Sequence, residues 1–263
     1  MKRNLSNLEI NNYLYEAGLD YVQKHNRWRL ESCFKGIERV SRWAFHHHPG
    51  RFADGALENI ALEKGRKLED RKKNNVIDIP NAKRRLCRTL HLATTLYDIG
   101  GHSKVLAKWV ERDKSAEHVV VLTNQENEIP CFFRQIITSD SNHCICLPTK
   151  DSIKKRALIV REISKSCDRV ILHTHPDDII PVLAFAKNCV PPVAMFNHAH
   201  FSFNLGSTVS DMIINTLEYF LKISEKYRFA KTTSLLYVFG SNFSLHNNSV
   251  DKKAAKKYLS LPE

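Results

Sequence analysis

The sequence lacks the features that would place it in a membrane or a secreted, disulfide-bonded class. No apolar run approaches the roughly 18–20 residues of a membrane span. The N-terminal segment MKRNLSNLE holds no apolar signal core, so nothing in it indicates secretion. The chain has 7 cysteines, an odd number without C-x-x-C spacing, which indicates reduced thiols. We therefore expect a cytoplasmic protein.

Two glycine-rich phosphate-binding motifs are also absent. The sequence contains no G-x-G-x-x-G, and no Gly-Lys-Ser/Thr after a longer glycine loop. Glycine is scarce, at 9 of 263 residues, yet two glycines stand together at Gly100-Gly101. Adjacent glycines can take the positive φ of a tight turn. This pair is either a functional turn or an ordinary connection between a strand and a helix, and spacing alone leaves both open.

The charge is strongly of one sign, because 40 Lys and Arg face 28 Asp and Glu, a net charge of +12. Such a charge favours anionic partners, such as phosphorylated substrates or lipid head groups, and it permits peripheral binding to the inner face of a membrane. The basic residues gather at 71–73, 83–85 and 252–257, and each cluster also fits a solvated linker or helix face. No recognised nucleic-acid module or interleaved aromatic residues accompany them. We expect no nucleic-acid partner.

The hydrophobic pattern divides the chain into segments of two kinds. A helical period over 8–22, 29–45 and 52–68 predicts three helices. After the charged, asparagine-rich segment 70–83, apolar runs alternate with helical segments. That alternation predicts an α/β fold with a Rossmann-like parallel sheet and helices on both faces. The predicted division is a helical extension and linker over 1–80, a Rossmann-like domain over 81–250, and the start of a further linker over 251–263.

Within the α/β part, short and continuously apolar or β-branched segments predict buried strands. Ser103 is the expected N-cap of the helix that follows the glycine turn. Cys144 and Cys146 fall on one face of a strand by alternation, in the core or at its rim. The predicted strands cover 89–96, 119–123, 132–138, 143–147, 168–174, 193–197 and 234–239; 211–215 is a short strand or a helix start; the predicted helices cover 103–113, 151–163, 178–187 and a segment ending near 227.

Polar residues follow three of the predicted strands at their ends, and five of these residues are histidines. Parallel α/β sheets bind ligands beyond the carboxyl ends of their strands. The sequence therefore predicts a site at this edge of the sheet. The candidate residues are Gly100, Gly101 and His102 after the first strand, His173 and His175 in the middle, and Asn197, His198 and His200 after the strand over 193–197.

Two chemistries compete for these residues. In the first, the histidines and Asp177 or Asp178 hold one or two divalent metals that activate water, as in a metal-dependent hydrolase. The pattern H-x-H-x-D-H is incomplete, however, because Asp178 stands where its final histidine should be. In the second, the histidines and Asn197 hydrogen-bond the hydroxyl and phosphate oxygens of a sugar or polyol. A non-catalytic module that binds sugars or lipid head groups is a further alternative.

Four motifs, in their order and spacing, resemble the N-terminal domain of GT-B-fold glycosyltransferases. They are YDIGGHS, RVILHTH, AMFNHAH and SDMIIN. The likeness is to the retaining, nucleotide-sugar-dependent group that includes glycogen-synthase-like and mannosyl transferases, and it spans residues 86–263. The ending KKAAKKYLSLPE is similar to the segment that leads into the second domain of those enzymes.

The resemblance implies transfer of a sugar from a nucleotide sugar to a sugar, polyol or lipid-linked acceptor, with retention. The nucleotide sugar is a co-substrate, and neither a metal nor another cofactor is implied. The donor-binding domain of the family has no counterpart in these residues, so this half would need one in cis or in trans and would transfer little alone. His198 would be the acceptor-contacting histidine important for transfer. The implied substrate-binding residues are Gly100, Gly101, His102, His173, His175, Asn197, His200 and Asp211.

Overall fold

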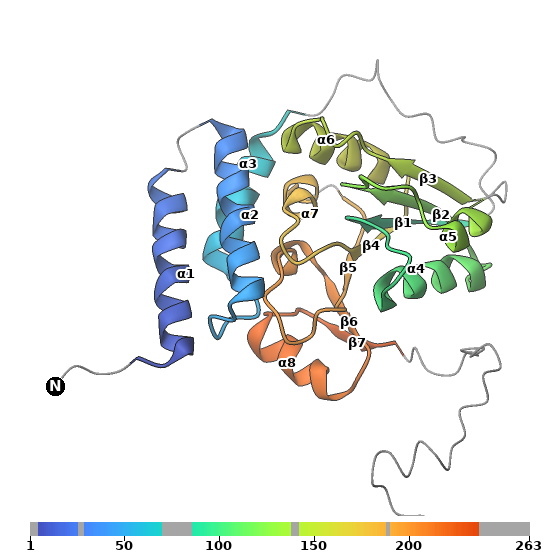
Figure 1. The fold of residues 1–263 in the computed structure, drawn as a ribbon. Helices are drawn as coiled ribbons and strands as arrows, with labels where there is room; N and C mark the ends of the chain where they lie inside the picture. The colour runs from blue at the N-terminus through green and yellow to red at the C-terminus, as the bar shows by residue number, and fades with distance from the viewer. Residues whose placement is uncertain (1–4, 26–28, 70–85, 138–141, 188–189, 237–263) are drawn as a thin grey trace, which may run out of the picture.

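The computed structural model describes residues 5–25, 29–69, 86–137, 142–187 and 190–236 (Figure 1). A sheet of seven strands runs through it, all parallel, in the order β3-β2-β1-β4-β5-β6-β7. The predicted α/β class is confirmed. The strands are β1 (Cys87–Ala93), β2 (Ala116–Leu122), β3 (Asn142–Cys146), β4 (Arg169–His173), β5 (Val193–Phe196), β6 (Met212–Asn215) and β7 (Thr233–Leu235).

Eight α-helices in the described part surround this sheet, and most lie where the hydrophobic period predicts them. None of the helices in the described ranges has the length and apolar character needed to cross a bilayer. The helices are α1 (Asn7–Lys24), α2 (Leu30–His46), α3 (Gly55–Lys67), α4 (Gly101–Arg112), α5 (Cys131–Ile136), α6 (Ile153–Ser164), α7 (Ile180–Ala184) and α8 (Tyr219–Tyr227).

Three expectations about local structure need correction or completion. The predicted strand over 132–138 is wrong, because α5 begins after Pro130 and turns Phe133 into the core. Ser103 is not an N-cap; Gly100, with φ +136°, precedes the helix, and the Ser103 hydroxyl accepts a hydrogen bond from the Tyr97 amide at 2.9 Å. The segment 211–215, left open between strand and helix, contains β6. The linkers predicted over 70–83 and 251–263, and all three basic clusters, lie outside the described residues.

The first three helices pack onto one face of the sheet. Figure 1 shows α1 outermost, with α2 and α3 between it and α6 and α7. One continuous core joins Tyr15, Phe34 and Leu57 of these helices to Leu90 and Leu172 of the sheet. Burial of this apolar surface holds the helical segment on the α/β part. The division at residue 80 remains a prediction.

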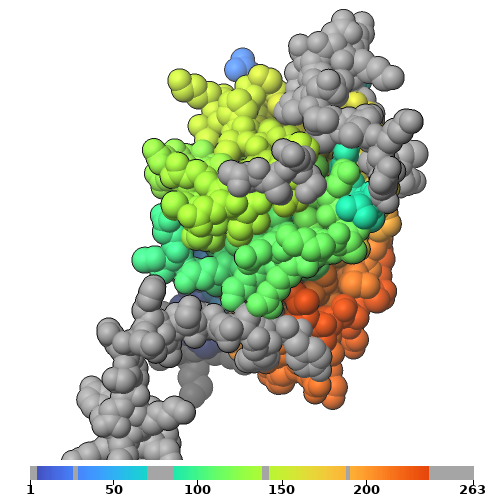
Figure 2. Space-filling model, turned by 90° about the vertical axis from the view of Figure 1, so that its right-hand side faces the viewer, coloured from blue at the N-terminus to red at the C-terminus, as the bar shows by residue number. Residues whose placement is uncertain are grey.

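The opposite face of the sheet is covered by α4 and α5. Alternation along β1 sends Leu90 and Leu92 into the first core and Ala93 into the core under α4 and α5. In the side view of Figure 2 the green surface of this part lies beside the orange C-terminal elements. The result is a three-layer arrangement, with the sheet between two layers of helices.

Gly65 marks a contact between α3 and α7 too close for a side chain. A Cβ there would lie 2.7 Å from the Ala186 Cβ and 2.9 Å from the Leu183 carbonyl oxygen. We expect Gly65→Ala to lower the free energy of unfolding by about 1–3 kcal/mol in chemical denaturation. Gly55→Ala is the matched control, because its Cβ would meet nothing within 4 Å. Equal stability of the two variants would contradict this packing.

Candidate functional site

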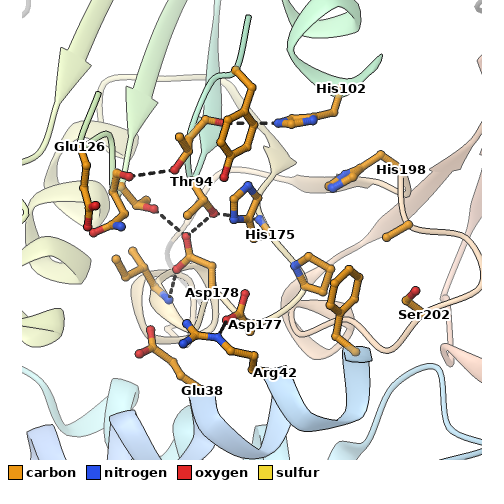
Figure 3. Close-up of a pocket in the computed structure, with 18 of the residues that line it drawn as sticks. Glu38, Arg42, Thr94, His102, Glu126, His175, Asp177, Asp178, His198 and Ser202 are labelled. Carbon is orange, nitrogen blue, oxygen red and sulfur yellow. Dashed lines mark hydrogen bonds and ion pairs between the residues drawn. The ribbon is translucent and has the colours of Figure 1, made fainter. Parts of the chain in front are cut away.

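A cavity of about 880 Å³ lies beyond the carboxyl ends of β1, β2, β4 and β5 (Figure 3). Since β2 and β4 flank β1, the chain connections leave in opposite directions here, and open α/β sheets bind ligands at such a point. One wall comes from α2. The lining includes Thr94, Thr95, Tyr97 and His102 after β1, Thr123 and Asn124 after β2, His175, Asp177 and Asp178 after β4, His198 and Ser202 after β5, and Glu38, Arg42 and Phe45 from α2.

Asp178 ties three strand ends together at the floor of the cavity. One carboxylate oxygen accepts hydrogen bonds from the hydroxyls of Thr94 at 2.7 Å and Thr123 at 2.6 Å. The other accepts from the Ile180 amide at 2.9 Å. Among the described residues no group of three or more His, Cys, Asp or Glu is placed to hold a metal ion. The metal-dependent alternative therefore has no ligand set in this part of the chain.

The wall contributed by α2 carries two charged side chains, Glu38 and Arg42, which reach toward the floor in Figure 3. The Arg42 guanidinium donates to the Asp177 carboxylate at 2.6 Å. Burial, together with the nearby carboxylates of Asp178 and Asp177, raises the pKa of Glu38 to about 8. Sequence reasoning missed both residues. No local signal distinguishes them from other charged residues of an amphipathic helix.

Three predicted histidines meet at the cavity: His102, His175 and His198. The Tyr97 ring stacks on His175 with centroids 5.7 Å apart, and His102 stacks on His198 at 5.3 Å. Burial lowers the pKa of His175, and it lowers that of His198 to about 4. His175 and His198 are therefore expected to be neutral at physiological pH, so they offer flat rings and neutral hydrogen-bonding atoms rather than charge.

Other predicted site residues lie elsewhere. His173 is fully buried and hydrogen-bonds to His91, and the buried Asn197 amide donates to the Asn215 side chain at 2.9 Å. His200, which shares a hydrogen bond with the Thr216 hydroxyl at 2.9 Å, lines a smaller hollow of about 320 Å³ beside Gly101, His102 and His198. Asp211 precedes β6 and accepts from the Val193 amide at 3.0 Å, at the amino ends of the strands. It is therefore remote from the cavity.

The loop after β5 is held by a buried arginine, Arg228, which follows α8. Its guanidinium donates to the carbonyl oxygens of Ala199, His200 and Ser202 at 2.8–3.1 Å, and to that of Phe52 at 2.8 Å. Burial lowers its pKa to about 10. Arg228 thereby positions the segment that carries His198 against the segment before α3.

Glu38 should give the fold a pH dependence. Its pKa is raised on folding, so its contribution to stability is present at low pH and is lost as the pH rises toward and through 8. We expect Glu38→Gln to raise the melting temperature at pH 9, with the difference from the unsubstituted protein closing near pH 4. Thermal unfolding at both pH values measures this. Glu63→Gln, at an exposed position of α3, is the control and should show no such divergence.

No protein-family model matches the sequence, and no curated protein matches it. Among solved structures, the chain is similar to one titled "Thermobaculum terrenum O-GlcNAc transferase mutant - K341M", with a TM-score of 0.44 and 13% identity over 80% of this chain. The match covers 38% of that protein's chain, so the present chain spans well under half of that neighbour's length.

Proposed function

We propose that this chain is the acceptor-side half of a glycosyltransferase. Acting with a donor-binding domain in cis or in trans, it transfers a sugar from a nucleotide sugar to a hydroxylated acceptor, with retention. The observation that carries the proposal is the cavity at the β1/β4 junction, which combines stacked rings with carboxyl, hydroxyl and amide groups. Sugars present both kinds of surface, since their ring carbons form flat apolar patches and their hydroxyls donate and accept hydrogen bonds.

The charges around the cavity favour a neutral acceptor. Arg42 is engaged by Asp177, and Arg156 donates to the Thr123 carbonyl at 2.8 Å and the Asn124 side chain at 3.2 Å. The two arginines of the lining are thus already bound by protein oxygens, and His175 and His198 are neutral. The net charge of +12 favours an anionic partner for the protein as a whole. The groups around the cavity favour a neutral ligand in the cavity itself. An anionic membrane surface, as the location of a lipid-linked acceptor, stays a prediction.

His198 is the residue to which we assign contact with the reacting acceptor hydroxyl. Its neutral ring lines both the main cavity and the smaller hollow beside Gly101. The Gly100-Gly101 turn begins α4, whose first amide groups carry partial positive charge suited to the donor diphosphate. In this proposal the leaving diphosphate assists attack on the same face of the donor sugar. No protein nucleophile is required.

Ligand-observed NMR tests the binding half of the proposal. Saturation transfer is measured on the chain with neutral sugars and polyols, each paired with its phosphorylated form. We expect binding of neutral compounds and at least tenfold weaker binding of their phosphates, because the carboxyl groups of Glu126, Asp177 and Asp178 line the cavity. Tighter binding of the phosphates would contradict a neutral acceptor.

A transfer assay tests the chemistry. With a donor-binding domain supplied in cis or in trans, label from a nucleotide sugar should pass to the acceptor with its anomeric configuration kept. Absence of transfer from every nucleotide sugar would support the non-catalytic module instead. Stoichiometric zinc or manganese held by the histidines would support the hydrolase.

A further inference from the structure

Three buried histidines lie on a diagonal across the sheet. His118 of β2 pairs in register with Thr89 of β1, and His91 lies two residues further along β1. His91 in turn pairs with Ile171 of β4, and His173 lies two residues further along β4. Steps of two residues keep all three side chains on the same face of the sheet, the one covered by α4. Each is at most 1% exposed.

Hydrogen bonds join these three rings into a row, which we call the histidine chain. His91 shares one hydrogen bond with His118 at 3.0 Å and another with His173 at 3.1 Å. The far end of the chain meets the backbone carbonyl oxygen of Asp113, 2.8 Å from Nε2 of His118. A carbonyl can only accept, so Nε2 of His118 must carry the proton that it donates there.

The Asp113 carbonyl sets the direction of the other hydrogen bonds in the histidine chain when its rings are neutral. Burial lowers the pKa of His91 well below its usual range and that of His173 to about 3, so each of these rings carries a single N–H at neutral pH. In the neutral form of His118 the single proton is on Nε2, so its Nδ1 accepts from Nε2 of His91. Nδ1 of His91 then accepts from Nε2 of His173. The only remaining atom, Nδ1 of His173, is therefore an unprotonated acceptor.

The next histidine on this diagonal is His198, two residues beyond Phe196 at the end of β5. Nδ1 of His173 and Nδ1 of His198 are both buried, and neither has a hydrogen-bond partner among the described residues. His198 follows β5, the strand beside β4, and it perturbs the pKa of His173 electrostatically. Figure 3 shows its ring directed into the cavity. A lone pair on His173 favours a proton on Nδ1 of His198, and a neutral ring has only one proton to place.

We propose that His118, His91 and His173 are positioning residues for His198. The chain keeps the His198 proton on Nδ1, toward the sheet, and leaves Nε2 as an unprotonated acceptor for a hydroxyl in the cavity. The hydroxyl ligand rests on the proposed function. The tautomer itself is a property of the protein without ligand, and it can be measured separately.

Nitrogen-15 NMR of the histidine rings tests this. In long-range ¹H–¹⁵N correlation spectra at neutral pH, His198 should show a protonated Nδ1 and an unprotonated Nε2. Its signals are assigned by their loss in His198→Gln. A protonated Nε2 on His198 would overturn the proposal without any further variant.

Substitutions that break the histidine chain test whether the buried histidines set the tautomer of His198. In His91→Phe an aromatic ring is kept and both hydrogen bonds are lost, so we expect the His198 proton to shift toward Nε2. His118→Phe breaks the chain at its far end and provides a second variant should the first fail to fold. His47→Gln, at an exposed position, is the control. A His198 tautomer unchanged in a folded chain-breaking variant would overturn the proposal, whether or not any sugar binds.

Discussion

His198→Ala should weaken the binding of a neutral sugar by about 10- to 100-fold. The ring contributes a hydrogen bond, worth about 0.5–1.5 kcal/mol, and a stacking surface, worth about as much again. Together these correspond to one to two powers of ten in Kd at about 1.4 kcal/mol per tenfold. Because the ring lines the main cavity and the smaller hollow, the variant should keep its fold. Ligand titration followed by NMR measures the loss.

His47→Ala is the matched control for this change. His47 is exposed at the end of α2, where it stacks on Trp43 with centroids 3.8 Å apart, and it does not line the cavity. Its removal should leave sugar binding unchanged. Equal effects of the two substitutions would show that the site has been assigned to the wrong histidines.

Arg228→Met should cost about 3 kcal/mol or more of unfolding free energy and should also abolish sugar binding. Hydrogen bonds to a charged group contribute about 1.5–3 kcal/mol each, and the carbonyl groups left behind lose their partners. The affected carbonyls belong to the loop after β5 that carries His198. We therefore expect the loop to lose its geometry. Urea denaturation and sugar titration measure the two effects.

Arg161→Met is the control for Arg228→Met, because it should lower stability without changing the site. Arg161 is also buried, and it donates to the carbonyl oxygens of Gly65, Leu68, Leu183 and Ala184. These belong to the contact between α3 and α7, away from the cavity lining. We expect a comparable loss of stability with sugar binding kept in the folded fraction. If Arg228→Met stayed able to bind sugar as well as Arg161→Met, the positioning role of Arg228 would be wrong.

Sequence periodicity located most elements because helices and buried strands bury different sets of side chains. It failed at 132–138, where Phe132, Phe133, Ile136 and Ile137 are spaced as a helix would need but are too few to exclude a strand. The structure resolves the ambiguity: α5 begins after Pro130, and these residues pack beside α4. Short apolar runs have no unique period, so packing decides them.

The strand-end rule located the region of the cavity and three of its lining histidines, but not the rest of its lining. Parallel strands bring their carboxyl ends to one edge, which correctly placed His102, His175 and His198 together. His173 is the last residue of β4 and hydrogen-bonds to His91 on one face of the sheet. His175 lies in the loop beyond the strand end, where the strand alternation no longer applies, and it reaches the cavity. Where the strand stops, and so which histidine leaves it, depends on pairing with β1 and β5.

The sequence by itself determined the parallel α/β class, the three N-terminal helices and the cluster of histidines at the strand ends, because these follow from local periodicity and from the geometry of parallel strands. Only the tertiary structure decided that α2 forms a wall of the cavity with Glu38 and Arg42, and that His118, His91 and His173 join across the sheet. These contacts link residues 27 to 135 positions apart. They depend on burial of apolar faces and on strand register, which no local pattern encodes.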